Sequence, residues 1–96
     1  MSTVAKITLF SYSTGRRVTL SASRARLFEK ELRRITTFCP SQKGILPRVA
    51  PDCLIVIKRG KKKSEYELYA RAVLLHKRTR KIWQFYFGLL LLTWLK

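Results

Sequence analysis

Lysine and arginine are the residues of this sequence whose number and grouping point to a definite chemistry. Their side chains donate charge-assisted hydrogen bonds to phosphate and carboxylate oxygens, so a group of them can hold an anionic partner without making or breaking a covalent bond. The residues that we single out as candidate nucleic-acid contacts are Arg16, Arg17, Arg26, Lys30, Arg33, Arg34, Lys58, Arg59, Lys61, Lys62, Lys63, Lys77, Arg78, Arg80 and Lys81.

The balance of charge indicates what partner these residues would have. The chain has 96 residues, with 21 Lys and Arg against 5 Asp and Glu, and a net charge of +16. A small domain needs a net charge of only about 2–8 to stay in solution, whereas a larger excess repels itself and attracts polyanions. We therefore expect nucleic acid, RNA slightly before DNA, or a ribonucleoprotein complex whose acidic protein subunits add negative charge.

Tyrosines could add to such a contact. Tyr12, Tyr69 and Tyr86 would stack on bases where they are exposed, and each stacked base contributes about 1–3 kcal/mol. Half-buried packing in a sheet is the alternative for each of them. The tyrosines are therefore secondary to the cations as evidence of a binding surface.

Signals for catalysis are weak in comparison. General acid–base chemistry usually needs histidine or carboxylates placed close together, but the single histidine, His76, precedes the basic pair at positions 77 and 78. Glu65 and Glu67 share one face of a predicted strand, where they suit cross-strand partners of lysine or arginine. The sequence contains no metal-ligand spacing and no phosphate-binding loop. We predict a protein that is not an enzyme and that holds no metal or cofactor.

Three further functions remain open at this point. One is an adaptor or inhibitor that binds an acidic protein surface without nucleic acid. A second is a small basic ribonuclease toxin, because such toxins can work with Arg, Lys and Tyr, although the paired early helices expected of them are missing. The third is an interfacial membrane protein that uses the apolar segment from Trp83 to Trp94 and its basic flank. Within the main hypothesis, phage and mobile-element inhibitors of host nucleic-acid machinery, anti-CRISPR proteins among them, can be single domains of this size.

Composition predicts a folded module. Hydrophobic residues make up 47% of the chain and aromatic residues 11%, which is too apolar for a disordered basic tail. Residues 1–96 have room for one domain with one core. The first residues lack the pattern of a secretory signal, so we expect a cytoplasmic protein, in the host cell if it is phage-encoded. Cys39 and Cys53 are interpreted as reduced, small apolar residues.

The first half of the chain predicts a hairpin followed by a helix. Residues 7–12 and 17–20 read as strands with Gly15 in the turn between them, and Ser21 or Ser23 can cap a helix over about residues 22–35. Leu27 and Phe28 fall on its apolar face with Leu32 and Ile35. The opposite face carries the basic residues at 26, 30 and 33, with Glu29 spaced to pair within the helix.

The second half predicts mostly strands. Prolines at 40, 47 and 51 make residues 36–52 a long connection, and the apolar run at 53–57 predicts a central strand buried on both faces. Residues 65–77 lack Gly, Pro, Asn and Asp and read as one long strand, with a bulge near 70–72 because its inward positions change parity. The basic turns at 59–63 and 78–81 would then lie at opposite ends of that strand, with the helix between them.

The C-terminal residues are apolar. We expect a strand over 82–87 and a short buried helix over 89–96, since a run of this length is too short for the roughly 20 residues of a membrane span; a homodimer through this apolar end is an alternative use of it. The predicted fold class is α+β, a single small domain with an antiparallel sheet of about five strands, one amphipathic helix packed on it and the order ββαβββα. The core should contain Leu27, Phe28, Leu32, Leu54, Val56, Leu68, Val73, Leu75 and Phe85.

Overall fold

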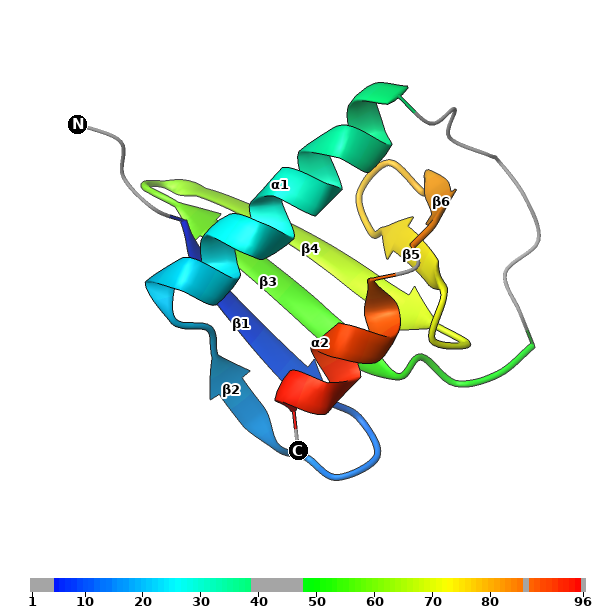
Figure 1. The fold of residues 1–96 in the computed structure, drawn as a ribbon. Helices are drawn as coiled ribbons and strands as arrows, with labels where there is room; N and C mark the ends of the chain where they lie inside the picture. The colour runs from blue at the N-terminus through cyan, green and yellow to red at the C-terminus, as the bar shows by residue number, and fades with distance from the viewer. Residues whose placement is uncertain (1–4, 39–47, 86, 96) are drawn as a thin grey trace.

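Six antiparallel strands form one sheet, and both helices lie on the same face of it in the computed structural model of the protein (Figure 1). The structure describes residues 5–38, 48–85 and 87–95. Along the chain the elements are β1 (Lys6–Ser11), β2 (Arg17–Thr19), α1 (Ala22–Phe38), β3 (Cys53–Arg59), β4 (Lys62–Tyr69), β5 (Val73–His76), β6 (Ile82–Gln84) and α2 (Gly88–Trp94). The predicted α+β fold is confirmed, with one strand more than expected and the order ββαββββα.

The strands lie in the order β2-β1-β3-β4-β5-β6, which makes β3 an inner strand as predicted. Its alternate residues Cys53, Ile55 and Ile57 face the helices and are buried. Leu54 and Val56 point to the opposite side, which we call the open face, and they are only half-buried there. Burial on both faces of this strand was therefore wrong, because α1 and α2 share one side of the sheet.

α1 begins where the sequence indicates. The hydroxyl oxygen of Ser21 accepts a hydrogen bond from the backbone N–H of Arg24 at 3.4 Å, which is the geometry of an N-cap. The helix extends three residues past the predicted end, to Phe38. Phe28 is fully buried and meets Phe85 edge to face, with ring centres 5.8 Å apart.

The buried face of α1 differs from the predicted one. Ala25, Phe28 and Ile35 are buried, whereas Leu27 is 45% exposed. Leu27 is one residue, or about 100°, away from Phe28 around the helix, so the face centred on Phe28 does not include it. Of the other predicted core residues, Leu68, Leu75 and Phe85 are buried, and Leu32, Leu54, Val56 and Val73 are half-buried.

The predicted long strand over 65–77 is instead a hairpin. Ala70 and Arg71 have φ angles of 49° and 63°, and the backbone N–H of Ala72 donates to the carbonyl of Tyr69 at 3.1 Å. Two successive positive φ angles form the tight turn that suits the twist of a hairpin, a position usually filled by Asn or Gly. Neither residue occurs here, so no turn is evident from the sequence, and the change of parity suggested a bulge instead.

Two neighbours fix this turn in place. The carboxylate of Asp52 accepts the backbone N–H of Arg71 at 2.7 Å. Gly88, the first residue of α2, packs on the carbonyl of Arg71, where the Cβ of any other residue would collide with that oxygen. Since β5 therefore runs back along β4, the turns at 60–61 and 77–81 open toward the same end of the sheet, and the prediction of opposite ends was wrong.

The C-terminal helix α2 lies beside α1 on the same face of the sheet (Figure 1). β6 ends at Gln84, earlier than predicted, and α2 buries Leu91 and the following Leu95. Leu89 and Leu90 remain 60% and 38% exposed. Within the part of the chain that the structure describes, neither helix has the length and apolar character needed to cross a membrane. Cys53 is a buried free thiol, and Cys39 lies outside the described residues.

Candidate functional site

All five carboxylates of the chain are engaged by neighbouring groups, so the excess of positive charge is what the surface presents to a partner. Two of them are on α1, one precedes β3 and two are on β4. Glu29 bonds to Arg59, Glu31 to Arg34 at 3.0 Å, Asp52 to the N–H of Arg71, Glu65 to Lys63 and Lys77 at 3.2 and 3.4 Å, and Glu67 to the hydroxyls of Tyr12 and Tyr69 at 3.0 and 3.3 Å.

The β3–β4 hairpin gathers cations at one end of the sheet. Strand register places Lys6 opposite Lys58, and Lys58 opposite Lys63, so three lysines lie in a row across β1, β3 and β4. The next pair along the hairpin is Arg59 opposite Lys62, with Lys61 in the turn. All of these residues are exposed. We call them the hairpin-end cations: Lys6, Lys58, Arg59, Lys61, Lys62 and Lys63.

The β5–β6 turn adds charge at the same end. Arg78, Arg80 and Lys81 are exposed, and Lys77 reaches Glu65 on β4. His76 precedes this turn, and its Nδ1 accepts the backbone N–H of Thr79 at 3.1 Å. Partial burial lowers the pKa of His76, and the positive charges of Arg78 and Lys81 lower it further. The histidine therefore responds to the positive field of the turn.

Some of the basic residues on the exposed face of α1 lie close to the β3–β4 hairpin. A cleft of about 300 Å³ separates α1 from the hairpin, and its lining includes Arg33, Arg59 and Lys62. Glu29 bonds across this cleft to Arg59, so the predicted pairs of Glu29 with Arg26 and Arg33 within the helix were wrong. Arg26, Lys30 and Arg33 are exposed on α1. Arg34 is bonded to Glu31 and lowers the pKa of that carboxyl.

The arginines of the first hairpin lie elsewhere. Arg16 and Arg17 follow β1, whose last residue Ser11 is opposite Cys53, the first residue of β3. They are therefore at the end of the sheet away from the hairpin-end cations. Arg17 pairs with Phe10, and its guanidinium carbon lies 5.8 Å from the centre of the phenyl ring. The fifteen predicted contacts thus lie on four segments of the fold, namely the β3–β4 hairpin, the β5–β6 turn, α1 and the β1–β2 hairpin, and do not form one continuous surface.

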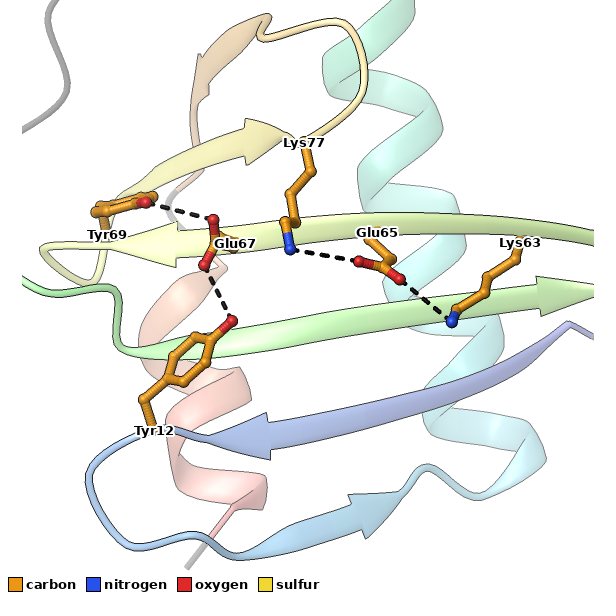
Figure 2. Close-up of polar contacts among 6 residues, drawn as sticks. All are labelled: Tyr12, Lys63, Glu65, Glu67, Tyr69 and Lys77. Atoms are coloured by element: carbon orange, nitrogen blue, oxygen red, sulfur yellow. Dashed lines mark hydrogen bonds and ion pairs between the residues drawn. The ribbon is translucent and has the colours of Figure 1, made fainter.

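Figure 2 shows the open face, where the two glutamates of β4 have different kinds of partner. The ammonium of Lys63, and then that of Lys77, lowers the pKa of Glu65. Glu67 instead accepts hydrogen bonds from Tyr12 and Tyr69. Partial burial and the nearby Glu67 raise the pKa of both tyrosines. Their hydroxyls are thus occupied, although Tyr12 remains 41% exposed; Tyr86 lies outside the described residues.

The open face also has a groove that the sequence did not predict, although Arg17, Lys58 and Lys63 in its lining are among the predicted contacts. Its volume is about 480 Å³, and it is lined by Lys6, Thr8, Phe10, Tyr12, Arg17, Thr19, Leu54, Val56, Lys58 and Lys63. The alternation of residues 6–12 could have found it, because the odd positions of that strand are buried and the even positions share the other face. Lys6 and Phe10 stand outside the basic runs of the sequence, so charge alone does not identify them.

Grouped metal ligands are absent from the described residues. Across residues 5–38, 48–85 and 87–95, no cluster of three His, Cys, Asp or Glu side chains could hold a metal ion. Comparison of the chain with protein-family models, curated proteins and solved structures found no significant match.

Proposed function

We propose that this protein is a non-catalytic module that binds nucleic acid, with RNA as the first candidate, either free or within a ribonucleoprotein complex. The observation that carries the proposal is the register of the hairpin end. Lys6, Lys58 and Lys63 lie directly opposite one another on adjacent strands. Like charges in this position destabilise a sheet, and phosphate groups placed between them would remove that cost.

The use of acidic residues elsewhere supports the same conclusion. On the open face Glu65 pairs with Lys63 on its own strand and with Lys77, which follows the neighbouring strand, so this sheet accommodates ion pairs along and across its strands. At the hairpin end Lys58 and Arg59 face only cations across the strand pair. Among the six hairpin-end cations, only Arg59 and Lys63 have a carboxylate partner among the described residues. A surface kept charged merely for solubility would mix the two signs more evenly, so the excess of cations at this end is better explained by an anionic partner.

An acidic protein surface is the second candidate, because it offers negative charge without a repeating backbone. The geometry favours phosphates over carboxylates for one reason: the cations continue from the hairpin to the β5–β6 turn and to Arg33, three places around one end of the fold. A nucleic-acid backbone can follow such a path, since it carries a charge at every nucleotide.

A pull-down with and without nuclease tests the proposal. The protein is prepared in high salt, immobilised, and incubated with a cell extract that has been left intact or digested with a nonspecific nuclease. Direct binding to a fluorescent 20-nucleotide RNA is measured in parallel. We expect nuclease to release the partners and the purified RNA to bind. Partners that survive nuclease, together with no binding of RNA or DNA at low salt, would show that the target is an acidic protein.

A further inference from the structure

The groove on the open face has the composition of a site for unpaired bases. Its floor is formed by Leu54 and Val56, which are half-buried, and Phe10 stands beside them on the neighbouring strand. Both helices are on the opposite side of the sheet (Figure 1), so this face is open to a ligand. A planar, apolar ligand with negative charges at its edges would match it.

Rings and a guanidinium form one wall of the groove. Phe10 meets Tyr12 edge to face, with ring centres 5.6 Å apart and planes at 87°. Arg17 lies over the phenyl ring of Phe10, 5.8 Å from its centre. Aromatic rings and arginine guanidiniums are the groups on which bases of single-stranded nucleic acid stack, whatever their sequence.

The charge of the groove fits phosphates. Four of its lining residues are cations, Lys6, Lys58 and Lys63 at one end and Arg17 toward the other, and none of the described residues that line it is acidic. Of the carboxylates on β4, Glu65 is paired with two lysines, and Glu67 accepts hydrogen bonds from two tyrosine hydroxyls (Figure 2). The groove therefore joins the row of hairpin-end lysines to an aromatic wall.

We infer that the open-face groove binds a single strand of nucleic acid, with a base stacked against Phe10 and Arg17 and the backbone held by Lys6, Lys58 and Lys63. A duplex fits this groove poorly, because its bases are stacked on one another and present only their edges. The inference rests on the proposed function and deepens it by naming the form of nucleic acid.

Binding of a 12-nucleotide RNA and of the same sequence in a duplex tests the inference, using fluorescence anisotropy at one salt concentration. The wild-type protein should bind the single strand more tightly. Phe10→Leu should weaken single-strand binding at least about fivefold, the lower end of the loss for one stacked base, and should leave duplex binding unchanged. Tyr69→Leu is the matched control, because Tyr69 is on the same face but does not line the groove.

A second readout does not depend on a variant that folds. RNA containing 4-thiouridine is crosslinked to the wild-type protein with long-wavelength light, and the tryptic peptides are identified by mass spectrometry. We expect crosslinks in the peptide of residues 7–16, which contains Phe10 and Tyr12. Equal binding of single strand and duplex, with crosslinks only outside that peptide, would overturn the inference and leave the proposed function intact. No binding to either RNA at low salt would instead overturn the proposed function.

Discussion

The carboxylate of Glu29 on α1 bonds to the guanidinium of Arg59 at the end of β3, thirty residues further along the chain. This contact joins the helix to the hairpin across the cleft that Arg33 and Lys62 also line. It leaves Arg26 and Arg33 without the partner that helical spacing predicts for them. The bond from Glu29 to Arg59 thus holds the basic face of α1 next to the hairpin-end cations.

Glu29→Gln should therefore strengthen binding of nucleic acid. The substitution raises the net charge by one and frees Arg59, so we expect a gain of a few-fold in affinity at low salt. Stability should change by no more than about 1 kcal/mol, because the Arg59 side chain is about half exposed and solvent screens the pair. Glu31→Gln makes the same change of charge beside Arg34, away from the cleft, and should give a smaller gain. A larger gain for Glu31→Gln in the same titration would contradict this account of the hairpin end.

Phe28 and Leu27 give a direct test of how α1 packs. Phe28 is fully buried against Phe85, whereas Leu27 is 45% exposed. Phe28→Ala should lower the free energy of unfolding by about 3–5 kcal/mol, and Leu27→Ala should change it by no more than about 0.5 kcal/mol. Urea denaturation of the two variants measures both values. Similar losses for the two would mean that the helix face is rotated from the one described.

Ala70 occupies a strained backbone position that can be relieved. Its φ of 49° lies in the left-handed region, which costs most residues about 1–2 kcal/mol and costs Asn less. Ala70→Asn should raise the free energy of unfolding by about 1 kcal/mol, since Asn suits this position of the turn. The melting temperature should rise accordingly. A fall would indicate that residues 65–77 form the continuous strand that the sequence suggested.

His76 should report on the positive field of the β5–β6 turn. Burial, Arg78 and Lys81 lower its pKa below the ordinary value of about 6.5. The folded state thus prefers neutral histidine, so its contribution to stability is present above about pH 6.5 and is lost as pH falls through the folded pKa. His76→Gln should remove this part of the pH dependence of unfolding.

Binding should move the same pKa in the opposite direction. Phosphates near Arg78 and Lys81 would offset their charge, so we expect the pKa of His76 to rise in the presence of RNA. The chain has a single histidine, so its imidazole signals in an NMR titration need no further assignment. An unchanged pKa in saturating RNA would place the nucleic acid away from this turn.

The sequence predicted the class of fold because its signals were local and strong. Ser21 caps α1 as expected, and the apolar run of β3 is an inner strand. The turn at Ala70 and Arg71 could not be predicted, because no Gly or Asn marks it and the contacts that hold it come from Asp52 and Gly88, which are distant in sequence. Because of this turn the sheet has one strand more than predicted, and the strands after the turn run in the opposite direction to the predicted ones.

The sequence predicted which residue types make up the candidate site, but it did not predict where on the fold they come together. Lys58, Lys61, Lys62 and Lys63 were identified from their run of charge, but their alignment with Lys6 depends on strand register, which the sequence does not specify alone. Leu54 and Val56 were assigned to the core because a continuous apolar run does not reveal which face is covered. Their half-exposure is what opens the groove.

The dependence of RNA affinity on salt tests most directly the claim that the hairpin-end cations hold phosphates. The logarithm of the binding constant for a single-stranded RNA is measured against the logarithm of salt concentration for the wild-type protein and two double variants. Neutralising Lys61 and Lys62 to Gln should reduce the slope by about 1.4, because each contact with a single strand contributes about 0.7. Neutralising Arg16 and Arg71 to Gln makes the same change of charge at the other end of the sheet and should leave the slope unchanged. Equal slopes for the two double variants, or a flat slope for the wild-type protein, would contradict the account.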